Sequence, residues 1–120
     1  MSIPLIGLRT VIYPASDLEA VKTWWSQILG QEPYFDEPFY VGFAVAGYEL
    51  GLLPDADPAD GALVYWGVQD VAAAVDLAVA AGCTAHTPVA EVGDGIVTAS
   101  VRTPTGSILG LIFNPHFGDQ

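Results

Sequence analysis

Positive charge is scarce in this chain of 120 residues, which has three Lys and Arg residues against 14 Asp and Glu, a formal net charge of −11. Nucleic acids and anionic membranes bind proteins through basic patches, so we expect no nucleic acid and no membrane as a partner. The charge would favour a cationic small molecule, and it also keeps a protein soluble.

Cysteine is nearly absent, because Cys83 is the only one. It cannot form a disulfide within the chain, which fits a reducing compartment, and we expect a cytoplasmic protein. Cys83 has no basic neighbour in sequence, so we interpret it as an inert thiol.

Long hydrophobic runs are also missing, since Gly, Pro or charged residues interrupt every apolar stretch before the ~20 residues of a membrane helix. No basic segment precedes the apolar residues at the N-terminus, so we expect no signal peptide. The sequence has no P-loop, dinucleotide-binding, nucleophile-elbow or C-x-x-C motif.

Hydrophobic residues, in contrast, make up 52% of the chain and charged residues only 14%. This composition predicts one folded domain with a sizeable core. An internal repeat divides it: G-x-x-L-G-L at residues 47–52 recurs 59 positions later at residues 106–111. We therefore expect two similar modules, one of about residues 5–54 and one of about residues 62–115, with an exposed linker at 55–61.

The first module reads as β-α-β-β-β. A strand at 8–13 precedes a helix of about residues 17–29, which we expect to begin with a capping box of Ser16 and Glu19 and to end at Gly30. Leu18, Val21, Trp25 and Ile28 recur at helical spacing and predict its buried side. Strands are expected at 33–35, 39–45 and 48–53, with turns at 36–38 and 46–47.

The second module repeats this order. We expect a strand at 62–68, a helix capped by Asp70 that runs to about Ala81, and strands at 84–89, 96–102 and 107–113. Pro88 favours an edge position for the 84–89 strand, and residues 91–95 read as a turn. The fold class predicted is therefore α+β.

This doubled unit resembles the vicinal oxygen chelate superfamily, which includes glyoxalase I, extradiol dioxygenases and bleomycin-resistance proteins. The matching motifs are residues 16–20 with 28–30, residues 68–71 with 81–82, and Thr103-Pro104-Thr105-Gly106 before Leu109-Gly110-Leu111, where the superfamily usually has D-P-x-G. The resemblance implies a curved mixed sheet around a cleft, with the helices on its outer face.

The resemblance also implies where a divalent metal would bind. Metal-dependent members have one ligand on the first strand and one on the last strand of each module, and these positions are Thr10, Gly51, Leu63 and Gly110 here. A catalytic site needs about three ligands from His, Cys, Asp or Glu. The sequence therefore predicts no metal and no cofactor. His86 and His116 stand alone, without a second His two or four residues away, and we interpret them as solvent-facing or hydrogen-bonded imidazoles.

Strand alternation from those four positions predicts the residues that line the cleft. They are Thr10, Ile12, Glu49, Gly51, Leu53, Leu63, Tyr65, Ile108, Gly110 and Ile112. Glu49 could neutralise a cationic ligand, act as a base, or be a solvated rim carboxylate. The two glycines could leave space for a ligand or relieve crowding between strands.

The leading hypothesis is a metal-independent small-molecule binding protein that resembles the bleomycin-resistance type, with a planar or cationic ligand. We expect it to be a homodimer and not an enzyme. Two alternatives stay open: a lyase, isomerase or dioxygenase of the glyoxalase kind, and an interaction module whose cleft is vestigial.

Overall fold

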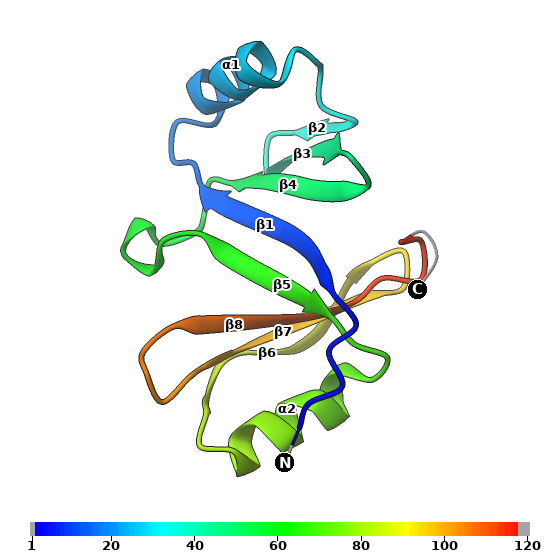
Figure 1. The fold of residues 1–120 in the computed structure, drawn as a ribbon. Helices are drawn as coiled ribbons and strands as arrows, with labels where there is room; N and C mark the ends of the chain where they lie inside the picture. Colours follow the sequence, from blue (N-terminus) through cyan, green and yellow to red (C-terminus); the bar gives the residue numbers. More distant parts are fainter. Residues whose placement is uncertain (1, 118–120) are drawn as a thin grey trace. The chain divides into compact units, whose positions relative to one another are not determined.

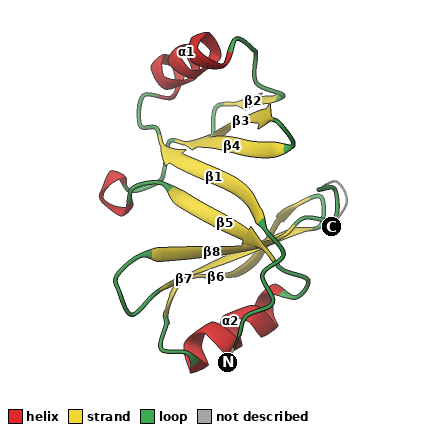
Figure 2. Ribbon diagram, in the orientation of Figure 1, coloured by secondary structure: helices red, strands yellow, loops and turns green. Residues whose placement is uncertain are grey.

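The computed structural model describes residues 2–117, which form two compact units. The first unit comprises residues 10–63, and the second comprises residues 64–117 together with residues 2–9. The order of elements is β-α-β-β-β, repeated once (Figures 1 and 2). The predicted α+β class and the doubled unit are confirmed.

In the first unit the elements are β1 (Leu8–Pro14), α1 (Leu18–Leu29), β2 (Phe35–Glu37), β3 (Tyr40–Val45) and β4 (Tyr48–Leu53). The strands lie in the order β2-β3-β4-β1, with β1 parallel to β4 and the other neighbours antiparallel. A short 3-10 helix, Pro58–Asp60, lies in the predicted linker. The second strand begins later than expected, so the predicted turn at 36–38 is wrong for Asp36 and Glu37.

A tight turn joins β3 to β4. Ala46 and Gly47 both have positive φ, 51° and 89°, as a two-residue hairpin turn requires. The turn pairs Val45 with Tyr48 and, three residues further along each strand, Gly42 with Gly51. Two glycines thus face each other across neighbouring strands.

Helix α1 starts one residue later than the predicted capping box. Asp17 is the N-cap, and its Oδ1 accepts from the Ala20 amide at 3.3 Å. The box of Ser16 and Glu19 is wrong, because Asp17 takes the capping role and the Glu19 carboxylate lies 2.8 Å from Lys22 Nζ instead. Gly30 ends the helix in the left-handed conformation, as predicted.

The core of the first unit lies between α1 and its sheet. Val41, Phe43 and Leu52 are fully buried there, together with Ala15. The helix packs on them with Leu18, Val21, Trp25 and Leu29. Ile28 was predicted to be buried, which is wrong, because the residue is 59% exposed. Leu29, four residues after Trp25, packs on the core in its place.

In the second unit the elements are β5 (Leu63–Gly67), α2 (Val71–Ala80), β6 (Thr84–Gly93), β7 (Ile96–Arg102) and β8 (Ile108–Phe113). The strands lie in the order β5-β8-β7-β6, and β5 is parallel to β8. Asp70 caps α2 as predicted, with its Oδ1 3.0 Å from the Ala73 amide.

Strand β6 is longer than predicted, because it continues past residue 89 and through residues 91–93, which we expected to be a turn. Its register against β7 shifts at three places, and such irregularities let a strand continue past residues that break a regular ladder. β6 pairs with β7 and lies at the end of the strand order, so the predicted edge position is confirmed.

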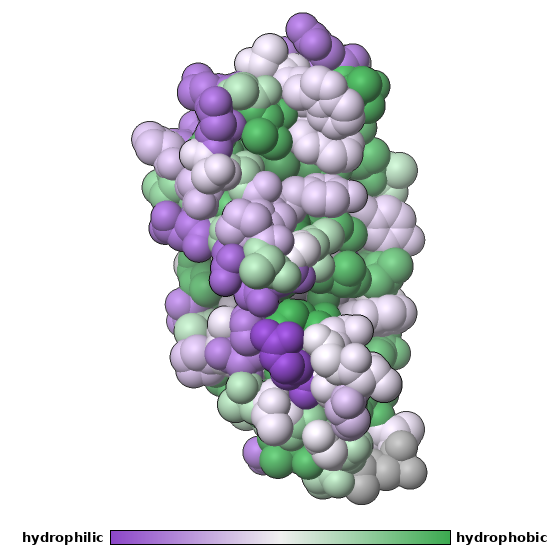
Figure 3. All heavy atoms as spheres, turned by 90° about the vertical axis from the view of Figure 1, so that its left-hand side faces the viewer, coloured by the Kyte–Doolittle hydropathy of each residue, from purple (hydrophilic) through white to green (hydrophobic). Residues whose placement is uncertain are grey.

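The core of the second unit contains Val68, Val71, Ala74, Ala99 and Leu111. The N-terminal segment contributes Ile3, and it is tied to β5 by hydrogen bonds from the Ile6 amide to Gly67 O and from the Gly67 amide to Gly7 O. Outside the cores, several large hydrophobic side chains are exposed, and hydrophobic and polar residues alternate over the side of the molecule that Figure 3 shows. No helix among residues 2–117 is both long and apolar enough to cross a membrane.

Candidate functional site

Each unit has one sheet face under its helix and an opposite face that carries the glycine of the repeated L-G-L motif. We call the second of these the glycine face. Registers place Thr10 opposite Glu49 and Ile12 opposite Gly51 in the first unit, and Tyr65 opposite Gly110 in the second. The predicted site residues of each unit therefore share its glycine face, because directly paired residues point to the same side of a sheet.

In the first unit the Gly42–Gly51 pair lacks Cβ atoms on this face, and other side chains cover it. A Cβ on Gly51 would lie 2.7 Å from the Tyr40 ring, beneath its hydroxyl, and one on Gly42 would lie 2.9 Å from Glu49 Oε2 and 3.1 Å from the Tyr34 ring. Two phenols and one carboxylate thus lie directly over the glycines.

Glu49 is held by two neutral donors. The Thr10 hydroxyl donates to its Oε1 at 3.2 Å, and the Tyr34 hydroxyl donates to its Oε2. Burial, and then the bond to Glu49, raises the pKa of Tyr34 well above its ordinary value, so the phenol stays a protonated donor at neutral pH. No Lys or Arg of residues 2–117 forms an ion pair with Glu49, whose negative charge is therefore balanced only by hydrogen bonds.

Aromatic rings continue from this patch to the edge of the sheet. The Phe35 ring centroid lies 6.1 Å from that of Tyr40 and 6.0 Å from that of Phe39. Tyr34 is 62% exposed and Phe39 61% exposed, which is unusual for side chains of this size. The glycine face of the first unit is therefore aromatic, with the carboxylates of Glu49 and of Glu37, which pairs with Tyr40.

In the second unit the space beside the glycine is filled. A Cβ on Gly110 would lie 2.6 Å from the backbone oxygen of Val64 and 2.7 Å from the Tyr65 ring. Burial raises the pKa of Tyr65, and Ile112 is largely buried. Gly110 therefore relieves crowding between strands, which was one of the two roles considered for the glycines.

A polar cluster lies on the other side of Gly110. Ser100 on β7 pairs with Gly110, and its Oγ lies 2.9 Å from His86 Nδ1 and 2.7 Å from Thr87 Oγ1. The remaining histidine, His116, has its Nε2 2.9 Å from the backbone oxygen of Asp94. Both imidazoles are hydrogen-bonded, as predicted.

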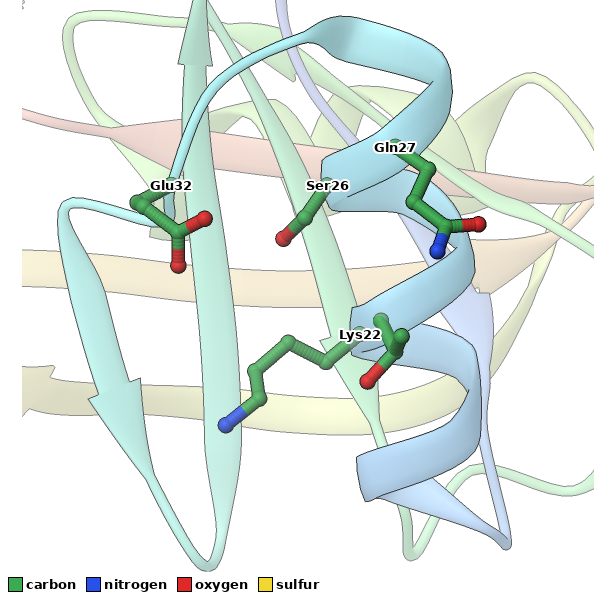
Figure 4. Close-up of a pocket in the computed structure, with 5 residues that line it drawn as sticks. Lys22, Ser26, Gln27 and Glu32 are labelled. Atoms are coloured by element: carbon green, nitrogen blue, oxygen red, sulfur yellow. The ribbon is translucent and has the colours of Figure 1, made fainter.

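Two depressions flank α1 in the first unit, away from the predicted site residues. One of about 260 Å³ is lined by Lys22, Thr23, Ser26, Gln27 and Glu32 (Figure 4). The other, of about 680 Å³, lies between the start of α1 and the turn after β2, and Lys22 lines it too. The Lys22 ammonium is bound by Glu19 and Asp36, at 2.8 and 3.0 Å.

Comparisons with known proteins find the fold but no close relative. No family model and no curated protein matches the chain. Among solved structures, a methylmalonyl-CoA epimerase from Streptomyces coelicolor aligns with a TM-score of 0.72 at 16% identity, over 97% of this chain and 99% of that one.

Two further structures agree. The methylmalonyl-CoA epimerase from Mycobacterium tuberculosis has a TM-score of 0.69 at 17% identity, over 96% and 93% of the two chains. A glyoxalase/bleomycin resistance protein/dioxygenase superfamily member from Vibrio splendidus has a TM-score of 0.64 at 17% identity, over 89% and 99%. The chain has the vicinal oxygen chelate fold. Identities this low establish the fold and leave the activity open.

The residues present do not fit the metal centre that the vicinal oxygen chelate fold often carries. Thr10 donates to Glu49, and the other three expected positions are Leu63 and the two glycines, which offer no ligand side chain. Within residues 2–117, no three His, Cys, Asp or Glu side chains are grouped closely enough to hold a metal ion. No chemical step through a metal is therefore derived.

Three residues of the glycine face were missed from the sequence, namely Tyr34, Tyr40 and Gly42. A signal existed for two of them: the turn predicted at 46–47 fixes the pairing of Gly42 with Gly51, and alternation then places Tyr40 on the same face. Tyr34 precedes β2, where alternation gives no direction. Its position depends on a hydrogen bond from its amide to Gly42 O at 3.0 Å.

Proposed function

We propose that the chain is a metal-independent small-molecule binding protein, similar in this respect to the bleomycin-resistance type. The ligand is a planar or cationic organic molecule, and it binds on the glycine face of the first unit. The observation that supports this proposal is the Gly42–Gly51 pair, over which Tyr34, Tyr40 and Glu49 lie.

Each part of this arrangement suits such a ligand. Paired glycines let the rings of Tyr34 and Tyr40 lie close to the backbone, and a flat molecule reaches the backbone where these rings turn aside. Aromatic side chains stack on planar ligands, and an aromatic pair contributes about 0.5–1.5 kcal/mol beyond the area it buries. A carboxylate without a basic partner attracts a cation. Since Tyr34 is mostly exposed, its ring can turn away from Glu49 without opening the core.

Binding is tested by thermal unfolding with 9-aminoacridine, a planar cation, and with acridone, its neutral counterpart of similar shape. We expect the melting temperature to rise with the concentration of 9-aminoacridine, since a ligand that binds only the folded state stabilises it. Acridone should give a smaller rise. If neither compound changes the melting temperature at any concentration up to its solubility, the proposal is wrong.

The variant Glu49→Gln locates the site. It keeps the size of the side chain and removes the charge, so 9-aminoacridine should bind about tenfold or more weakly, while acridone binding should change little. Glu32→Gln is the matched control, because Glu32 is an exposed carboxylate of the same unit that lines the depression beside α1 and not the glycine face. Equal losses in both variants would indicate attraction by overall charge and not by Glu49.

We also propose that the protein is a homodimer, because the proteins it resembles usually are. We propose a cytoplasmic location, because the chain has a single cysteine. Light scattering at several protein concentrations measures the mass directly, and a value close to the monomer mass of 12.6 kDa would exclude the dimer.

A further inference from the structure

Helix α1 is covered less completely than α2. None of the twelve residues that the structure describes in α1 is fully buried, whereas Val71, Ala74 and Ala78 of α2 are. Even Trp25, which packs on the core of the first unit, is only half-buried. Because a helix in a folded protein is stabilised mainly by burying its apolar side, α1 has apolar surface left for a further contact.

That surface lies on one flank of the helix. Ala20, Trp24 and Ile28 are four residues apart, so they form one row along α1, which we call the apolar flank. Trp24 is 54% exposed and Ile28 is 59% exposed. The Trp24 ring is held edge-on against Trp25, with 5.1 Å between the centroids, and Trp25 stacks on Tyr13 at 5.4 Å. A fixed and half-exposed tryptophan beside an exposed isoleucine is typical of a protein interface.

The charged residues of α1 lie on its other flank. Glu19 and Lys22 are the only charged residues of this helix, and they form an ion pair with each other at 2.8 Å. Lys22 and Ser26 point toward the segment that carries Glu32 (Figure 4). The row of Ala20, Trp24 and Ile28 is therefore free of charge.

Charge indicates which partner covers the apolar flank. A strongly charged partner would find no ion pair there. Two copies of a chain with net charge −11 repel each other, and the repulsion is weakest where both contacting surfaces are uncharged.

The row is also complementary to itself. When two copies of α1 pack antiparallel about a twofold axis, Ile28 of one copy lies against Ala20 of the other, so a large side chain meets a small one. The two Trp24 side chains then lie beside the axis, at the centre of the contact. Tryptophan at such a central position commonly contributes much of the binding energy of an interface.

We propose that the apolar flank of α1 is the contact between two copies of this chain, packed antiparallel with Trp24 at the centre. This inference rests on the proposed homodimer and names its interface. A helix of twelve residues is about 18 Å long, so the contact is at the small end of specific interfaces, and the dimer dissociates on dilution.

Sedimentation equilibrium over a range of protein concentrations measures the dissociation constant. Ile28→Glu puts a charge in the contact and should raise the dissociation constant about tenfold or more. Val92→Glu is the matched control, because Val92 is an aliphatic residue of similar exposure, 61%, on β6 of the second unit. It adds the same charge to the chain and should leave the dissociation constant nearly unchanged.

A second substitution tests the antiparallel arrangement. Adding Ala20→Lys to Ile28→Glu places an ammonium group against the carboxylate of the other copy, so dimerisation should recover about threefold or more. Residues 20 and 28 are about 12 Å apart along one helix, so an ion pair within one chain does not explain a recovery. Recovery also shows that Ile28→Glu still folds.

Trp24 reports the contact by fluorescence. An indole emits at shorter wavelength when water leaves its surroundings, so the emission of the unaltered protein should shift as the concentration rises through the dissociation constant. Trp24→Phe keeps an aromatic ring and should lose this shift, while Trp25 and Trp66 remain.

The outcomes separate this inference from the proposals on which it depends. If the protein is a dimer and Ile28→Glu weakens it no more than Val92→Glu does, the copies meet elsewhere and the interface is wrong, although the homodimer stands. A monomer at every concentration would exclude both. Glu49→Gln should leave the dissociation constant unchanged, so failure of the planar-ligand site is distinguishable from failure of the dimer.

Discussion

The two glycine faces have the same strand pairing and carry different side chains. In the first unit the residue that pairs with the motif glycine is Gly42, covered by Tyr34 and Glu49. In the second unit the equivalent residue is Ser100, bonded to His86 and Thr87. The two units thus share their strand pairing, while one face is aromatic and acidic and the other carries a cluster of a serine, a threonine and a histidine.

The helix sides of the same sheets show the reverse behaviour. Leu52 and Leu111, the last residues of the repeated motif, are both fully buried beneath a helix. Packing constrains these positions, because a buried residue must fill a fixed space among many neighbours. Packing under the helices therefore explains why the motif leucines are the same in both units. The glycine faces are not packed under a helix, and their side chains differ between the units.

The largest effects are expected where the two units are alike. Leu52→Ala and Leu111→Ala each remove a fully buried side chain, and each should lower the free energy of unfolding by about 2–5 kcal/mol. Denaturation by urea gives both values. If one variant lost less than half as much as the other, the two cores would differ, and the similarity of the helix sides would be superficial.

Effects of intermediate size are expected from replacing the two motif glycines by alanine, and the two losses of stability should differ. Gly110→Ala puts a Cβ 2.6 Å from the backbone oxygen of Val64, which cannot move without distorting β5, so we expect a loss of about 3 kcal/mol. Gly51→Ala meets only the side chain of Tyr40, which can turn toward solvent, so a loss of about 1 kcal/mol is expected.

Urea denaturation of both variants measures this difference, and Ala44→Gly on β3 serves as a control for the intrinsic preference of glycine in a strand. Equal losses at residues 51 and 110 would show that the Tyr40 ring is as fixed as backbone. The Gly42–Gly51 pair would then be a packing feature, as Gly110 is in the second unit.

The sequence predicts the elements and the helix sides of the sheets better than it predicts the glycine faces. The repeat, the hydrophobic spacing and the caps at Gly30 and Asp70 are local signals, and they predict the element order and the fold class. The errors at Ser16, Ile28, residues 36–37 and residues 91–93 are shifts of one turn position or of a few residues at the ends of elements, where several residues compete for one role.

The glycine faces were harder to predict, because their chemistry depends on side chains that come from outside the repeat. Tyr34 lies before β2, and His86 reaches Ser100 through a bulge that no pattern in residues 84–93 signals. Alternation placed Glu49, Gly51 and Tyr65 on the correct face but could not show what covers them. Such contacts depend on tertiary structure, which sequence periodicity does not contain.

The smallest effect concerns the bond between Tyr34 and Glu49 and appears only at high pH. The pKa of Tyr34 is raised in the folded state, so the unfolded chain releases the phenolic proton first as the pH rises through its ordinary value of about 10. Above that pH the folded state binds more protons than the unfolded state, and stability falls with pH. The variant Tyr34→Phe should therefore lose less stability than the unaltered protein between pH 9 and 11 (about 1 kcal/mol or less, since Tyr34 is mostly exposed).

Tyr65 separates this effect from that of burial alone. Its pKa is also raised, but by burial without a carboxylate partner, so Tyr65→Phe should reduce the same loss of stability. Replacing Glu49 by Gln should lower the pKa of Tyr34 toward its ordinary value and leave that of Tyr65 unaffected, because Tyr34 is the one of these two tyrosines that donates to that carboxylate. Urea denaturation at several pH values measures all three variants. If Glu49→Gln did not change the high-pH loss, the Tyr34–Glu49 bond would contribute nothing, and the acidic character of the first glycine face would not depend on that bond.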